Sequence, residues 1–198
     1  MEFELSIKNK KNLQMKTLKI ALVTLSLGLM TSVNAQNGVL QNQQVQPRPQ
    51  PKQISELDYE AHADGWLVDI NKAYEISKKT GKPILANFTG SDWCGWCKKL
   101  KYEVFDKPAF KEWAEKTVVL VELDFPRRFQ IPQKYKEQNA GLQQAFKVSG
   151  YPTIWVFNLG KDDKGQYSIN ALGKTGYVKG VSAFTGGVNN MIEKGKAQ

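Results

Sequence analysis

Cysteine and histidine are scarce in this chain, which has two cysteines and one histidine among its 198 residues. A structural zinc site usually takes four ligands, either two cysteine pairs or one cysteine pair with two histidines. The single histidine, His62, lies far upstream of Cys94 and Cys97. These numbers argue against a zinc site. A second cysteine pair is also missing, so disulfide exchange by this chain would need another protein as its electron partner.

Long apolar runs are missing too. The main apolar stretch, residues 20–33, is shorter than the ~20 residues that a membrane span needs. Lysines precede this stretch and small residues follow it up to Ala35, an order typical of a secretory signal peptide. We therefore predict a signal peptide at residues 1–35, with an uncleaved membrane anchor as the alternative. Met15 is a second candidate start, which would place residues 1–14 upstream of the true one.

Positive charge is in excess but is not gathered into one patch. The chain has 28 lysines and arginines against 19 aspartates and glutamates, a formal net charge of +9. The basic residues are scattered and are not interleaved with aromatic residues, as they often are in nucleic-acid-binding surfaces. We therefore expect a solvated basic surface and no nucleic-acid partner.

Residues 36–53 are rich in glutamine, asparagine and proline and nearly lack large apolar side chains. Such a segment cannot bury enough apolar surface to offset the entropy lost on ordering. The sequence therefore predicts a flexible linker at 36–53, followed by a folded domain at 54–198.

Hydrophobic periodicity within residues 54–198 predicts alternating helices and strands, and therefore an α/β fold. We expect the strand after Pro83 and the strand that ends at Asp124 to pair in parallel, because a helical segment connects them. The predicted elements are a helix capped by Asp64, carrying Trp66 on its apolar face and ended by Gly81; a strand at 84–88; a helix from Cys94 to about 105 that restarts at Pro108; a strand at 118–124; a helix at 135–146; a hairpin of strands 153–157 and 166–172; and a closing helix at 181–192.

Both cysteines lie in one Cys-x-x-Cys motif between an apolar strand and a helix. This context favours a dithiol redox centre, with a metal clip and a pair of inert buried thiols as the alternatives. Cys94 would lie at the first turn of the helix, where unpaired N–H groups and the helix dipole stabilise an anion. Cys97 would lie one turn further on.

Two motifs resemble those of the thioredoxin superfamily, over a region from about Gly65 to Lys194. Residues 93–98 (Trp-Cys-Gly-Trp-Cys-Lys) resemble its active-site motif, and residues 148–153 (Val-Ser-Gly-Tyr-Pro-Thr) resemble its cis-proline loop. The resemblance implies a thioredoxin-like fold, with a central mixed β-sheet flanked by helices. Residues 88–92 are similar to those of secreted thioredoxin-like proteins of bacteria with an envelope, which implies a periplasmic or secreted protein.

The resemblance also implies an activity, that of a thiol–disulfide oxidoreductase. Cys94 would attack a disulfide of a protein substrate, and Cys97 would resolve the mixed disulfide. No cofactor is expected beyond the redox-active Cys94–Cys97 disulfide. The expected partners are protein thiols and disulfides and an unidentified electron donor or acceptor in the envelope, and we expect a monomer. The alternative is a module that binds client proteins with little redox turnover.

Four further residues are expected to bind substrate. Trp93 and Trp96 would offer an apolar platform, and the backbone of Tyr151 would pair with an extended substrate. We expect Pro152 to be cis, with a trans turn proline as the alternative. Trp96 stands where reducing thioredoxins commonly have proline, so the resemblance fixes neither the reduction potential nor the direction of electron flow.

Two residues are expected to tune the pKa of the thiols. Lys98 would add positive potential beside the motif. The buried acid that thioredoxins often carry on the preceding strand is replaced here by Asn87, which cannot ionise. Asp92 would be its more exposed substitute.

Overall fold

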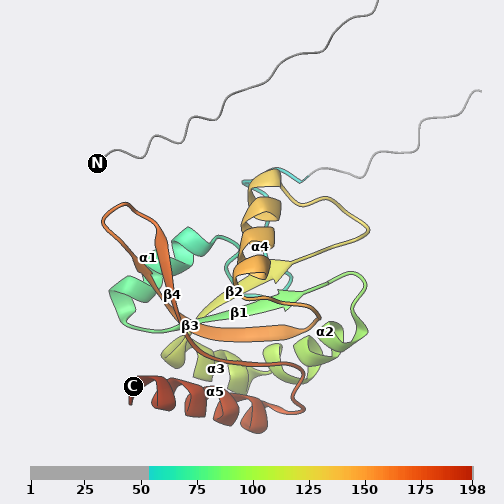
Figure 1. Cartoon of the computed structure of the whole chain (residues 1–198). Coiled ribbons are helices and arrows are strands. Elements are labelled where there is room, and N and C mark those ends of the chain that lie inside the picture. Colours follow the sequence, from blue (N-terminus) through green and yellow to red (C-terminus); the bar gives the residue numbers. More distant parts are fainter. Residues whose placement is uncertain (1–53, 198) are drawn as a thin grey trace, which may run out of the picture. The chain divides into compact units, whose positions relative to one another are not determined.

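The fold is built on a mixed four-stranded sheet with helices on both faces (Figure 1). It is seen in a computed structural model, which describes residues 54–197. The predicted signal peptide and linker, residues 1–53, lie outside the described part. The elements are α1 (Ile70–Thr80), β1 (Ile84–Thr89), α2 (Gly95–Leu100), the π-helical η1 (Lys101–Phe105), α3 (Pro108–Thr117), β2 (Val119–Asp124), α4 (Gln133–Ala145), β3 (Thr153–Lys161), β4 (Tyr167–Thr175) and α5 (Val181–Lys196).

Strand β1 is central to the sheet, whose order is β2-β1-β3-β4. It runs parallel to β2, as predicted, and antiparallel to β3. Strands β3 and β4 form the predicted antiparallel hairpin. All six residues of β1 are buried, which is expected of a strand covered on both faces. In the described residues, no helix has both the length and the apolar character to span a bilayer.

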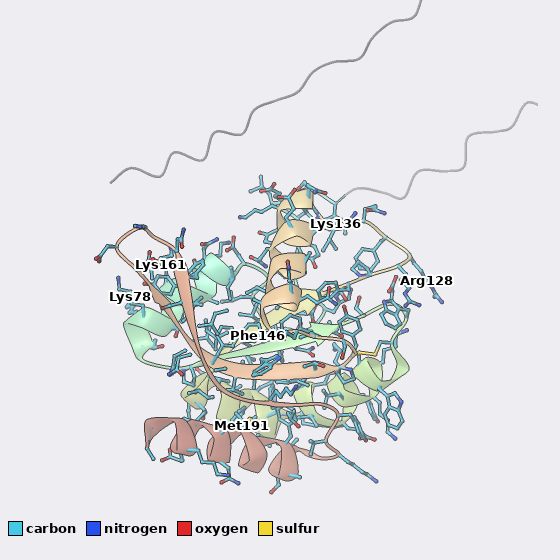
Figure 2. The ribbon with its side chains drawn as sticks, in the orientation of Figure 1. Lys78, Arg128, Lys136, Phe146, Lys161 and Met191 are labelled. Carbon is cyan, nitrogen blue, oxygen red and sulfur yellow. A yellow bond between two sulfur atoms is a disulfide. The ribbon has the colours of Figure 1, made fainter. Side chains whose placement is uncertain are left out.

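Each face of the sheet covers its own apolar core. Helices α3 and α5 and the turn η1 cover one face, with Phe110 and Phe184 fully buried between them and the sheet. Helix α1 and the end of α4 cover the other face, where Phe88 and Phe157 are buried. Figure 2 shows this layering, with Phe146 on one side of the sheet and Met191 on the other.

Helix α1 begins later than the sequence predicted. Asp69 caps it, accepting hydrogen bonds from the backbone N–H groups of Asn71 and Lys72, while the predicted cap, Asp64, is exposed. The reason is tertiary: Leu67 forms a parallel bridge to Val121 of β2, which holds this stretch extended.

This bridge also determines where the neighbouring residues lie relative to α1. Trp66, predicted on the helix face, lies before the helix and packs against Phe105 and Phe110. Gly81 ends α1 in the left-handed conformation, with φ 71°, as the sequence predicted.

The side chains of β1 and β2 change from apolar to polar as these strands approach the cysteine motif. On the face covered by η1 and α3, Leu85 is followed by Asn87 and then Thr89. The paired positions of β2 carry Glu122 opposite Asn87 and Asp124 opposite Thr89. All four polar side chains are buried. The sheet therefore brings a buried polar group to the edge at which α2 begins.

Candidate active site

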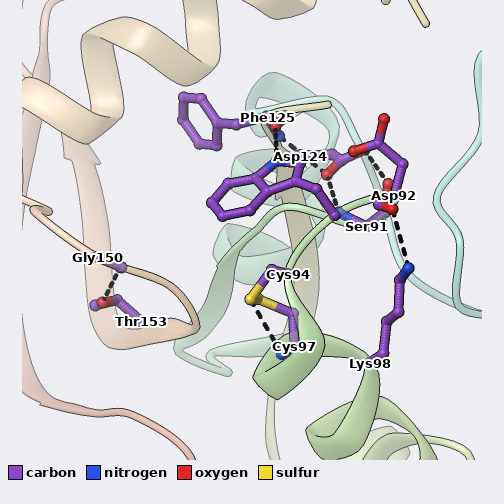
Figure 3. The surroundings of a disulfide bond; sticks show 10 residues. Ser91, Asp92, Cys94, Cys97, Lys98, Asp124, Phe125, Gly150 and Thr153 are labelled. Carbon is purple, nitrogen blue, oxygen red and sulfur yellow. Dashed lines mark hydrogen bonds between the residues drawn. A yellow bond between two sulfur atoms is a disulfide. The ribbon is translucent and has the colours of Figure 1, made fainter. Parts of the chain in front are cut away.

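The two cysteines are joined in a disulfide at the start of α2 (Figure 3), with 5.3 Å between their Cα atoms. Cys94 is the N-cap residue, and its Sγ accepts a hydrogen bond from the backbone N–H of Cys97 at 3.2 Å. Both residues are buried, with 6% and 5% of their surfaces exposed. One unpaired N–H group of the first helical turn is therefore directed at the sulfur of Cys94, as expected for a site that stabilises a thiolate.

Gly90 forms the turn between β1 and α2. Its carbonyl oxygen accepts hydrogen bonds from the N–H groups of Trp93, at 3.2 Å, and of Cys94, at 2.8 Å. A Cβ atom at position 90 would lie 2.4 Å from Cε2 of Trp93 and 2.5 Å from its Nε1. The turn therefore needs glycine because the indole ring of Trp93 packs directly on its backbone.

Asp124 holds the next residue of this turn in place. Its carboxylate accepts hydrogen bonds from the N–H of Ser91 at 2.8 Å, from the Ser91 hydroxyl at 2.6 Å and from the N–H of Phe125 at 2.9 Å. Burial raises the pKa of Asp124, and the bonds from Ser91 oppose that shift. Figure 3 shows Asp124 and Ser91 in contact beside the disulfide. The end of β2 thus fixes the loop that leads into the motif.

Trp93 is fixed on three sides. Its Nε1–H donates to the carbonyl oxygen of Phe125 at 2.8 Å. The guanidinium of Arg127 lies 3.7 Å from the indole centroid, within the range of a cation–π contact. The ring of Tyr151 meets it edge-on, with 5.7 Å between centroids.

The contact between Trp93 and Tyr151 brings the two predicted motifs together. The Tyr151–Pro152 peptide bond is cis, which confirms that prediction. Trp96 lies apart from this pair: it is 57% exposed and packs against Tyr177, with ring centroids 5.0 Å apart. The structure therefore places Trp93, Tyr151 and Pro152 in one group and Trp96 in another.

Asp92 and Lys98 are engaged with the backbone rather than with the sulfur atoms. The carboxylate of Asp92 accepts hydrogen bonds from the N–H groups of Arg127 and Arg128, the latter at 2.6 Å. Lys98 Nζ donates to the carbonyl oxygen of Asp92 at 2.9 Å. These bonds tie the loop after β2 to the residues before the motif.

Sequence reasoning missed a cluster formed by His62, Glu122 and Asp124. Glu122 Oε1 lies 3.0 Å from Nδ1 of His62 and accepts the backbone N–H of the same residue at 2.8 Å. Asp124 Oδ2 lies 3.8 Å from that ring nitrogen. The hydrogen bond to Glu122 raises the pKa of His62, and burial of the ring opposes it only in part. One signal was available in the sequence: Glu122 and Asp124 stand at alternate positions of an otherwise apolar strand.

A pocket of about 170 Å³ joins this cluster to the second cysteine. His62, Asn87, Cys97 and Glu122 are among the residues that line it, together with Lys98 and Lys101. Within residues 54–197, Oδ1 of Asn87 is buried without a hydrogen-bond partner. The same residues contain no group of three or more His, Cys, Asp or Glu side chains arranged to hold a metal ion.

The chain is similar to two proteins of Chlamydia pneumoniae. It is 35% identical to the disulfide bond reductase DsbH over 104 residues, which are 52% of this chain and 58% of that protein. It is 30% identical to the thioredoxin-related protein DsbJ over 108 residues, which are 54% of this chain and 30% of that protein. The matched region thus spans less than two thirds of either relative.

A solved structure of a DsbH oxidoreductase has the same fold, with a TM-score of 0.55 and 29% sequence identity. The match covers 70% of this chain and 94% of that one. The model of the thioredoxin-like domain family matches residues 70–175, which include β1, the cysteine motif and the cis-proline loop. Because that region is just over half of the 198 residues and carries both motifs, the chain belongs to the thioredoxin-like domain family.

Proposed function

We propose that this protein is a thiol–disulfide oxidoreductase that exchanges disulfides with protein substrates through Cys94 and Cys97. One observation carries the proposal: the two cysteines of the chain are paired at the start of α2, with Cys94 Sγ accepting the N–H of Cys97. That hydrogen bond favours a thiolate at Cys94 in the reduced protein. The relative DsbH is named a disulfide bond reductase, which supports a reductase or isomerase-like role.

The reaction proceeds in two exchanges. In the reduced protein, the Cys94 thiolate attacks one sulfur of a substrate disulfide, and the other substrate sulfur leaves as a thiolate that takes a proton. The Cys97 thiolate then attacks Cys94 Sγ, breaks the mixed disulfide and releases the second substrate sulfur. The protein ends with the Cys94–Cys97 disulfide, having given two electrons to the substrate. A separate thiol donor must reduce it again.

Substrate binds next to the motif, on Trp93, Trp96, Tyr151 and Pro152. The ring of Trp96 is exposed, and the ring of Trp93 is fixed by its hydrogen bond to the carbonyl oxygen of Phe125. Both rings offer apolar surface to an unfolded or extended chain. Asp92 and Lys98 act on the thiols indirectly, by fixing the backbone next to the motif. The Asp92 carboxylate accepts the N–H of Arg128 in the loop after β2, and Lys98 donates to the carbonyl oxygen of Asp92 just before the motif.

The protein acts in the periplasm or outside the cell, after removal of residues 1–35. The basic, apolar and small-residue pattern of that leader supports this location. Mass spectrometry of the protein from a cell-envelope fraction should find Gln36 at its N-terminus. A chain that still begins at Met1 or Met15 would contradict the proposal.

Trapping of substrates tests the activity. Cys97→Ser should accumulate mixed disulfides with client proteins, because attack by Cys94 still occurs and release does not. Cys94→Ser should trap nothing, and it should lose the reduction of insulin that the unaltered protein catalyses. A client-binding module with little turnover would instead hold clients without covalent links in all three proteins, and the unaltered protein would not reduce insulin.

A further inference from the structure

The pocket behind Cys97 contains an ionisable pair that the exchange reaction described above does not use. Glu122 is 4% exposed and His62 is 38% exposed, so the pair extends from the interior towards solvent. Two bonds fix the carboxylate, one from the backbone N–H of His62 and one with its ring Nδ1. A buried carboxylate in contact with a partly exposed imidazole can pass a proton from the interior to water.

The same pocket, which both this pair and Cys97 line, is large enough to hold water. Its volume of about 170 Å³ exceeds the ~30 Å³ that one water occupies in the liquid. Asn87 Oδ1, buried and without a partner among the described residues, is an acceptor for such a water. Strand register sets Asn87 directly opposite Glu122. Cys97, Asn87 and Glu122 therefore line one small space.

The second exchange requires a proton acceptor near Cys97. Cys97 is 5% exposed, and as a thiol it must lose its proton before it can attack the mixed disulfide. We infer that the His62–Glu122 pair accepts the proton of the Cys97 thiol and delivers it to solvent during this step. The inference rests on the proposed function, because it assigns a base to that reaction.

The proton leaves Cys97 Sγ and passes through pocket water to the His62–Glu122 pair. The Cys97–Cys94 bond forms as the bond between Cys94 and the substrate sulfur breaks, and that sulfur departs with the bonding electrons. The proton then leaves from the solvent-facing side of His62.

Other charged groups face the pair from each element packed against it. Asp124 of β2 and Asp92 of the motif loop raise the pKa of His62 together with Glu122. Tyr59, from the segment before α1, is buried near the two β2 acids, and its own pKa is raised by burial. On the other side, Lys98 Nζ is bonded to the carbonyl oxygen of Asp92 and Lys101 is paired with an aspartate of the same helical segment.

Stopped-flow reaction of the reduced full chain with Ellman's reagent isolates the step. The first thionitrobenzoate is released when Cys94 attacks the reagent, and the second when Cys97 attacks the Cys94 adduct. Thionitrobenzoate departs as a thiolate, so its departure needs no proton. Glu122→Gln should leave the first rate unchanged and slow the second by about a hundredfold at pH 7, the low end of what a positioned base contributes. The deficit should shrink above about pH 8.5, where a free thiol ionises in water.

His62→Gln provides a second variant in case Glu122→Gln does not fold. It alters a partly exposed side chain, keeps a donor for Glu122 and cannot exchange a proton at neutral pH. It should slow the second release by about tenfold at pH 7. Glu103→Gln is the control for the same substitution elsewhere: Glu103 is a partly buried glutamate, less buried than Glu122, with one side-chain partner, Tyr177, and it does not line the pocket. Its rates should equal those of the unaltered protein.

Three outcomes would overturn the inference. The second rate of Glu122→Gln could stay within about twofold of the unaltered protein from pH 6 to 9; it could be slowed equally at every pH, as a purely structural defect would be; or folded His62→Gln could stay within about twofold at pH 7.

Alkylation of Cys97 by iodoacetamide in Cys94→Ser distinguishes this failure from a failure of the proposed function. Comparing that variant with and without Glu122→Gln reports the ionisation of Cys97 where no disulfide exchange occurs. A matching pH profile in the two proteins overturns the inference, whether or not the unaltered protein reduces insulin.

Discussion

Gly90→Ala tests how closely the turn before the motif is packed against Trp93. The added Cβ would lie 2.4 Å, 2.5 Å and 2.7 Å from Cε2, Nε1 and Cζ2 of the indole. Contacts below 3.0 Å are essentially never seen for real Cβ atoms, so the ring must move. Movement would break the bond from Nε1 to the carbonyl oxygen of Phe125 and separate the indole from Arg127.

The expected cost has two parts, overpacking by the added methyl group and loss of the hydrogen bond. An extra methyl group in a packed site costs about 1–3 kcal/mol, and a lost hydrogen bond about 0.5–1.5 kcal/mol, so we expect about 1.5–4.5 kcal/mol in total. At about 2–4 °C per kcal/mol, the thermal midpoint of the oxidised protein should fall by about 3–18 °C. Circular dichroism gives the midpoint, and tryptophan fluorescence should report a more solvated indole in the native baseline.

Gly141→Ala is the control for that change. It makes the same substitution within helix α4, where a Cβ atom would have no neighbour within 4 Å. Because alanine is the better helix former, this variant should be more stable by about 0.5–1 kcal/mol. Equal midpoints for Gly90→Ala and the unaltered protein, with unchanged fluorescence, would refute the account of how Trp93 is held.

Three further predictions concern the thiols, the first helix and the buried acids. A thiol-specific alkylator at neutral pH should modify Cys94 of the reduced protein much faster than Cys97, as peptide mapping would show; faster modification of Cys97 would reverse their roles. Asp69→Ala removes the cap of α1 and an ion pair to a lysine of α4, and should lower the free energy of unfolding in urea by about 1–2 kcal/mol. The pKa of His62 is raised in the folded protein, so its bond to Glu122 stabilises the fold fully below about pH 6.5 and loses this effect as pH rises through the folded value. The stability difference between the unaltered protein and His62→Gln should therefore shrink from pH 6 to pH 8, and a difference that grows would contradict this sign.

The strands and the motif helix could be predicted because their signals are local. β1 is a continuous apolar run after Pro83, and it is buried on both faces as such runs are in parallel pairs. The helical segment after the cysteines divides near Pro108, where α3 begins, as predicted. The start of α1 was wrong because both Asp64 and Asp69 are suitable caps. The bridge from Leu67 to β2 decides between them, and local sequence contains no sign of it.

The candidate site likewise contains parts that local sequence predicts and parts that depend on tertiary contacts. The spacing of Cys94 and Cys97 and the cis-proline loop were visible in the sequence because each is a contiguous motif. The pairing of His62 with Glu122 was not, because the two residues are 60 positions apart and meet only when the segment before α1 lies along β2, where Leu67 bridges to Val121. The stacking of Arg127 on Trp93 likewise depends on how the loop after β2 folds back.

Equilibration of the protein with glutathione buffers of increasing ratio tests the central claim most directly. The fraction of protein in the disulfide form, measured by alkylation and mass, should change reversibly from fully reduced to fully oxidised. The curve should fit one two-electron couple within the range of about −270 to −120 mV known for dithiol oxidoreductases. A pair that stays entirely oxidised or entirely reduced across the whole series would contradict the claim that Cys94 and Cys97 form a redox-active centre.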